Sequence, residues 1–133
     1  MEKERNMEWK EGQEGTPEQA LLRFLYSWYR EDWSAAVLYT QKTWRAGESK
    51  PAKVLKWQLK DLKLKDLESI SKSEISPVVV DMRVVVLVET LGSLRKMKIV
   101  VRVIKEKGPY LPSLDGDWGI NPLSIRVEWE KLV

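Results

Sequence analysis

The sequence predicts an α+β fold in which N-terminal helices pack on a curved antiparallel sheet. Two patterns predict it. Apolar residues recur at helical spacing between residues 16 and 60, and apolar and polar residues alternate over 78–104 and again over 125–130. Because the helical segments all precede the long strands, we expect helices and sheet to form separate layers.

The chain has 133 residues, which suffices for one domain with a hydrophobic core. Residues 1–15 are polar and charged, with only Met7 and Trp9 as large apolar side chains. We therefore expect a flexible tail or linker at 1–15, followed by a single domain at 16–133.

The chain contains no cysteine and no histidine. The first absence excludes disulfides, thiolate metal sites and cysteine nucleophiles. The second excludes Ser-His-Asp triads and imidazole-bound metals. We expect no metal site and no cofactor.

The 23 basic and 20 acidic residues leave a net charge of only +3, a weak field that argues against nucleic acid as a partner. No apolar run approaches the roughly 20 residues that span a bilayer. The N-terminus lacks an apolar signal core, so the chain as written predicts a cytoplasmic protein. An extracytoplasmic protein is the alternative if an N-terminal anchor was removed.

The first helix is predicted from its start signal. Thr16 and Gln19 form a capping box around Pro17, which suits the first helical position because its missing N–H is not needed there. The apolar residues that follow at helical spacing form one bulky face: Ala20, Leu21, Phe24, Leu25 and Trp28.

Two further helices are predicted before the strands. Asp32 can cap a helix that begins at Trp33 and ends at Ala46-Gly47. Pro51, two residues after Ser49, marks the start of the third helix.

From Leu62 onward the apolar period changes to two, which predicts strands. The phase breaks near Asp66, which indicates a β-bulge or bend. Even positions from Val80 to Val88 are apolar, and after a turn at 91–94 so are the odd positions from Met97 to Val103. This pattern predicts a long antiparallel hairpin.

The C-terminal part is predicted from its breaks. Glu106 falls on the outward, polar side of the second hairpin strand. Prolines and glycines over 107–122 predict a loop. The last strand is expected to turn Ile125, Val127 and Trp129 inward.

This order of elements resembles that of the NTF2-like superfamily of cone-shaped, cystatin-like α+β domains. The resemblance lies in Thr16–Ala20, which opens the long helix, Glu31–Ala36 at the helix corner, and Val78–Ile104, which forms the bent hairpin. It covers most of 16–131. The resemblance implies a pocket between the long helix and the concave sheet, and often a dimer through the sheet.

The superfamily includes enzymes, small-molecule binders and assembly modules, so the resemblance alone does not choose among them. Its dehydratase-type members depend on histidine, which this chain lacks. Its isomerase-type members use a carboxylate base with a tyrosine and a protonated carboxylic acid. Tyrosines and acids are present here, but no spacing assigns those roles to them.

Seven large residues on or near inward positions are candidates for lining such a pocket and holding a small apolar ligand: Tyr26, Trp28, Tyr29, Trp44, Trp57, Met82 and Trp129. The alternative, which we favour, is a core filled by large rings, because apolar stripes at regular spacing usually pack.

Asp66 and Glu68 are the candidate acids. On a regular strand they would share a face with Leu62 and Leu64 and point toward the pocket, where a buried carboxylate can act as a general base. With a bulge at this point they face water, which is the interpretation that we favour.

The densest basic stretch contains Trp57 among six lysines: Lys50, Lys53, Lys56, Lys60, Lys63 and Lys65. Aromatic rings among lysines suit single-stranded nucleic acid. No arginine and no nucleic-acid motif accompanies them, so we favour a solvated helix face.

Four apolar residues interrupt the charged outer face of the hairpin and are candidates for a dimer face: Val85, Leu87, Val100 and Ile104. An outer sheet face exposed to water should be polar, so these residues predict a cover. A second copy of the chain and the loop at 107–122 are both open as that cover.

We therefore expect a non-catalytic binding or assembly module, a homodimer through its sheet that holds a small apolar ligand or a protein partner. An isomerase- or hydrolase-like enzyme that uses a pocket carboxylate with Tyr26 or Tyr29 is one alternative. An extracytoplasmic domain of an envelope or conjugation apparatus is another.

Overall fold

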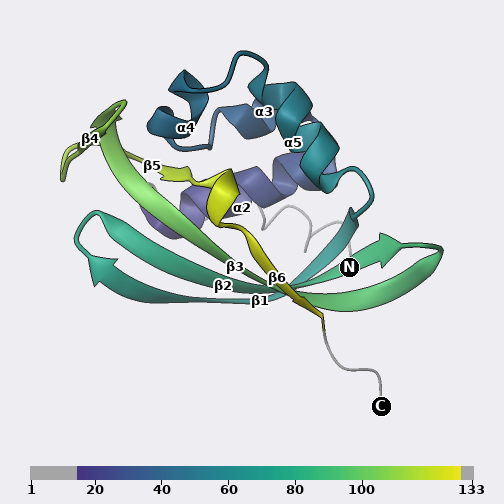
Figure 1. Cartoon of the computed structure of the whole chain (residues 1–133). Helices are drawn as coiled ribbons and strands as arrows, with labels where there is room; N and C mark the ends of the chain where they lie inside the picture. Colours follow the sequence, from purple (N-terminus) through teal and green to yellow (C-terminus); the bar gives the residue numbers. More distant parts are fainter. Residues whose placement is uncertain (1–14, 130–133) are drawn as a thin grey trace.

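Helices cover one face of an antiparallel sheet in a computed structural model of the chain (Figure 1). The structure describes residues 15–129, so the predicted tail, apart from Gly15, lies outside the described residues. This arrangement confirms the α+β class. In the described part of the chain, no helix has both the length and the apolar character needed to cross a membrane.

Helix α2, Pro17–Tyr29, begins as the capping signal predicts. Thr16 Oγ1 accepts a hydrogen bond of 3.2 Å from Gln19 N, which satisfies one of the free N–H groups of the first turn. The five predicted inward residues are all buried. Trp28 also donates from Nε1 to Leu62 O at 2.9 Å, which ties the helix to the start of the sheet.

The prediction of one continuous helix from Trp33 to Ala46 is wrong, because the structure has two short helices there. Helix α3 covers Trp33–Val37, with its first turn capped by Asp32, and helix α4 covers Lys42–Ala46. Between them the chain pairs with Ile120, which donates to Tyr39 O at 2.8 Å and accepts from Gln41 N at 2.7 Å. Helical hydrogen bonding cannot continue through a segment whose backbone pairs with a strand.

Helix α5, Pro51–Leu59, begins at the predicted proline. Its residues Leu55 and Leu59 are buried on the inner side of the helix. Lys53, Lys56 and Lys60 are exposed, as expected for an amphipathic surface helix.

Strands β1, Lys63–Ser76, β2, Val79–Thr90, and β3, Ser93–Gly108, are antiparallel neighbours in that order. Register shifts in β1 between Leu64 and Asp66, and again between Leu67 and Ser69, confirm the predicted bulge. The alternation in the hairpin is also confirmed, since its inward side chains are all buried: Val80, Met82, Val84, Val86, Val88, Met97, Ile99, Val101 and Val103.

The predicted loop at 107–122 is wrong, because much of it joins the sheet. Strands β4, Leu111–Pro112, and β5, Asp117–Ile120, pair with β3 along the edge that β2 leaves free. A short 3₁₀ helix, η1, Pro122–Ser124, then leads into strand β6, Arg126–Trp129, which pairs with β3 as well. A long strand with an unpaired edge must satisfy its N–H and C=O groups, and these segments do so.

The last strand keeps the predicted face but is less buried than expected. Val127 lies opposite Ile99 and Trp129 opposite Met97, so both are on the inward side. They remain 37% and 38% exposed because β6 lies at the sheet edge. The Arg95 guanidinium covers the Trp129 ring at 4.2 Å from its centroid.

Gly119 lets the 39–41 segment approach β5. A Cβ at this position would lie 2.6 Å from Thr40 O and 2.7 Å from Gln41 Cα, both backbone atoms that cannot move aside. We expect Gly119→Ala to lower the free energy of unfolding, measured by urea denaturation, by roughly 2 kcal/mol or more. Gly47→Ala, where the nearest atom is at 3.7 Å, is the matched control. Equal stabilities of the two variants would contradict this account of the contact.

Candidate functional site

The space between α2 and the sheet, where the resemblance implies a pocket, is filled by side chains. A cavity of only about 10 Å³ remains there. Its lining is entirely apolar: Leu21, Phe24, Leu25, Trp28, Val84, Ile99, Val101, Ile120 and Ile125. A water molecule needs roughly 10–15 Å³ and several polar partners. The described conformation therefore leaves no room for a ligand under α2.

The structure does not bring the seven predicted pocket residues together. Trp28, Trp44 and Met82 are buried in the core, where they fill space. Tyr26 and Tyr29 are half-buried on α2, with ring centroids 6.3 Å apart. The two that remain lie on separate elements: Trp57 is 76% exposed on α5, and Trp129 lies on β6.

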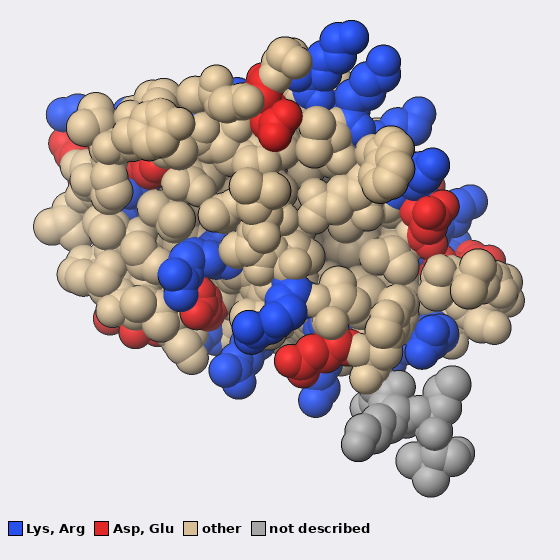
Figure 2. Space-filling view, viewed as in Figure 1, with Lys and Arg blue, Asp and Glu red and all other residues tan. Residues whose placement is uncertain are grey.

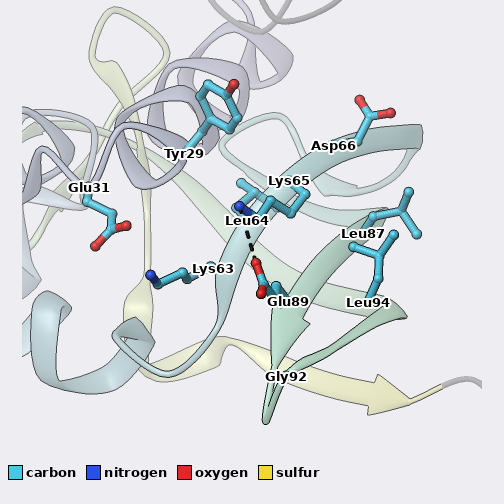
Figure 3. Close-up of a pocket in the computed structure, with 10 residues that line it drawn as sticks. All are labelled: Tyr29, Glu31, Lys63, Leu64, Lys65, Asp66, Leu87, Glu89, Gly92 and Leu94. Atoms are coloured by element: carbon cyan, nitrogen blue, oxygen red, sulfur yellow. Dashed lines mark ion pairs between the residues drawn. The ribbon is translucent and has the colours of Figure 1, made fainter. Parts of the chain in front are cut away.

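An open hollow lies between the end of α2 and the closed end of the β2–β3 hairpin (Figure 3). It has a volume of about 820 Å³. Its lining mixes charged, polar and apolar groups: Tyr29, Glu31, Lys63, Leu64, Lys65, Asp66, Leu87, Glu89, Gly92 and Leu94. Lys65 Nζ and Glu89 Oε1 form an ion pair of 3.3 Å across it, drawn as a dashed line in Figure 3.

The chemistry of this hollow is that of a solvated surface. The side chains of Lys65 and Glu89 are 48% and 45% exposed, so water screens their attraction. General acid–base catalysis at neutral pH usually relies on a desolvated carboxyl group, whereas the carboxylate of Glu89 is partly exposed and paired with a cation. The hollow offers hydrogen bonds to a passing ligand, but no desolvated acid.

The bulge places the two candidate acids on the solvent side. Asp66 lies opposite Leu87, and its Oδ1 accepts from Leu67 N at 2.8 Å. Glu68 is exposed and pairs with Lys96 at 3.2 Å. Neither lines the cavity under α2, which agrees with the interpretation favoured from the sequence.

A buried carboxylate lies elsewhere, at Glu106, and its predicted outward position is wrong. Glu106 is 2% exposed. Its two oxygens accept hydrogen bonds of 3.0 Å from Thr43 N and Gln41 Nε2, and a further one from the Thr43 hydroxyl. These bonds fasten the start of α4 to the end of β3, so the burial of Glu106 is explained by packing of the fold. No local sequence signal distinguishes Glu106 from a solvent-facing strand residue.

The outer face of the sheet gathers three arginines that sequence reasoning missed. Val100 of β3 is paired with Arg83 of β2 on one side and with Arg126 of β6 on the other. Arg102 lies two residues further along β3, on the same face. Arg102 donates to both carboxylate oxygens of Asp81, at 2.8 and 3.2 Å. The alternation of the strands indicates that each arginine faces outward. Only the pairing of β6 with β3 shows that the three arginines lie close together.

The four predicted dimer-face residues lie on this same side of the hairpin. Val85, Leu87, Val100 and Ile104 are each partly exposed. The segments within 107–122 pair at the edge of β3 and so extend the sheet instead of covering it. The helices occupy the opposite face (Figure 1).

Comparison with known proteins adds the fold alone. No protein-family model and no curated protein matches the chain. Its structure is similar to that of a SEC-C motif-containing protein from Psychrobacter arcticus, with a TM-score of 0.64 and 12% identity. The match covers 95% of this chain and 71% of that chain.

The Asp81–Arg102 pair makes stability depend on pH. The hydrogen bonds from Arg102 hold the pKa of Asp81 below its ordinary value of 3.8, and the charges of Arg126 and Arg83 act in the same direction. The stabilisation by this pair is therefore fully present at pH values above the ordinary pKa. It is lost as the pH falls through the lowered pKa of Asp81 in the folded state.

We expect Asp81→Asn to reduce the free energy of unfolding by about 0.5 kcal/mol at neutral pH, a small effect because the pair is partly exposed. The difference from the unaltered protein should vanish in acid, below the lowered pKa. Urea titrations across the acid range measure it. A difference that persists unchanged at the acid end would show that the charge of Asp81 is not its origin.

Proposed function

We propose that the protein is a non-catalytic binding or assembly module and that its working surface is the outer face of β2 and β3, where a second copy docks. The observation that carries this proposal is a set of partly exposed apolar residues on a sheet face that no described segment covers: Val85, Leu87, Val100 and Ile104. An antiparallel sheet with one solvated face is ordinarily polar on that face.

The charges on this face support one arrangement of the two copies. The three arginines lie at one end. Toward the other end lie mixed charges, where Lys65 pairs with Glu89 and Lys96 pairs with Glu68 beside Asp66. In a symmetric dimer the same surface meets itself. A two-fold axis that crosses the strands near Val85 would set the arginines of one copy against the mixed charges of the other and keep the two arginine clusters apart. An axis along the strands would bring arginine against arginine, which is repulsive.

The proposal includes membership of the NTF2-like superfamily. The helical layer over one face of a bent sheet, seen in Figure 1, supports it. A small apolar ligand or a protein partner remains part of the proposed function. The filled space under α2 favours surface contacts over a ligand enclosed in the cone.

An isomerase- or hydrolase-like enzyme is the second candidate function. It is favoured by one observation, that Tyr29 lines the same open hollow as Glu31, Asp66 and Glu89. The exposure of the hollow makes this candidate the weaker one.

The dimer is tested by sedimentation equilibrium over a wide concentration range. We expect a mass that rises from that of the 15.5 kDa chain toward twice this value. Val85→Glu and Leu87→Glu should each weaken association roughly tenfold or more, since each buries a charge in the interface.

Leu123→Glu is the matched control, because Leu123 is 80% exposed on η1, away from the outer face. It should leave the association constant unchanged. A protein that stays monomeric at millimolar concentration, or a control that weakens association as much as Val85→Glu, would refute the sheet dimer.

A further inference from the structure

Helix α5 presents a basic face with one large ring at its centre. Lys53, Lys56, Trp57 and Lys60 follow one another at the spacing that places residues on one side of a helix, and all four are exposed. We call this set the lysine face. Figure 2 shows blue side chains gathered at the upper right, over the region that α5 occupies in Figure 1.

The charges of the lysine face are uncompensated within the described structure. The sequence from 49 to 60 contains four lysines, Lys50 included, and no acidic residue. The nearest acids along the chain are Glu48 and Asp61. Among the described residues, none of these four lysines forms an ion pair. Like charges at such spacing repel each other, so an anionic surface would relieve an existing repulsion.

Trp57 is the apolar component of this face. It is 76% exposed, and the Lys60 ammonium lies 5.6 Å from its ring centroid. A shallow groove of about 490 Å³ between α3 and α5 adds further apolar surface beside Lys50 and Lys53, from Val37, Pro51 and Ala52. The outer helices therefore present apolar groups and cations side by side.

We propose that the lysine face docks on an anionic lipid surface, with Trp57 entering the headgroup region and the lysines contacting phosphate and carboxylate groups. An amphipathic indole is suited to that boundary, and lysines near an anionic leaflet attract it. Single-stranded nucleic acid fits less well, because it stacks successive bases on several rings and this face has one. The lysine face is on the helical side of the molecule, away from the outer sheet face (Figure 1).

The test is flotation of the full chain with lipid vesicles of phosphatidylcholine containing about 30% phosphatidylserine, compared with phosphatidylcholine alone. We expect binding to the anionic vesicles only, and its loss in high salt. The triple variant Lys53→Gln/Lys56→Gln/Lys60→Gln should bind at least tenfold more weakly, and Trp57→Ala should also reduce binding several-fold.

A second triple variant, Lys72→Gln/Lys98→Gln/Lys107→Gln, removes the same number of charges from exposed positions of the sheet. It should change vesicle binding less than about threefold, because charges remote from the membrane lie beyond the screening distance. Equal losses in the two triple variants would overturn the proposal, since binding would then follow net charge.

Two other results would also overturn it. One is the absence of binding to anionic vesicles. The other is tight binding of a poly-dT oligonucleotide without vesicle binding, which would assign the lysine face to single-stranded nucleic acid. Val85→Glu separates this proposal from the sheet dimer, because it should weaken dimerisation and leave vesicle binding intact.

Discussion

The packing of α2 against the inner side of the hairpin is the interaction on which the rest of the structure depends. The apolar stripe of the helix lies on the alternate side chains of β2 and β3, and burying each large side chain contributes roughly 1.5–3 kcal/mol. The bond from Trp28 Nε1 to Leu62 O fixes the end of the helix at the start of the sheet. Because large rings and branched chains fill the layer, only a very small void remains.

This filled interior determines where recognition can occur. A fold with an open cone can hold a ligand under its long helix, but here the described side chains occupy that space. The contacts proposed above use two surfaces that face in opposite directions (Figure 1). On the sheet side, arginines surround Val100, and on the helical side, lysines surround Trp57. The two surfaces differ in kind, because the first belongs to rigid paired strands and the second to a short surface helix.

Local sequence patterns predicted the elements whose burial repeats regularly. Helix α2 has a cap and a continuous apolar stripe, and the hairpin alternates over many residues, so both could be inferred in detail. The break between α3 and α4 could not, because it follows from pairing of Gln41 with Ile120, far away in the chain. Strand β5 was hidden for the same reason, since Gly116 and Gly119 read locally as turn residues.

The surface sites show the same limit. Alternation correctly placed Val85 and Leu87 on the outer face, and helical spacing correctly exposed the lysines of α5. The same alternation assigned Glu106 to the outer face, which is wrong, because Gln41 and Thr43 from a distant segment bury it. The arginine cluster depends on the register between β3 and β6, which no local pattern encodes. Residues whose environment comes from distant segments were the ones that the sequence could not place.

Methyl NMR spectra of the protein over a dilution series test the central claim most directly, that the interior is filled by side chains and the outer sheet face is the interface. The account predicts concentration-dependent shifts for the methyl groups of Val85, Leu87 and Val100. The inward methyl groups of Val84 and Val101 should keep constant positions. Unchanged outer methyl signals at every concentration, or shifts confined to the inward ones, would contradict it.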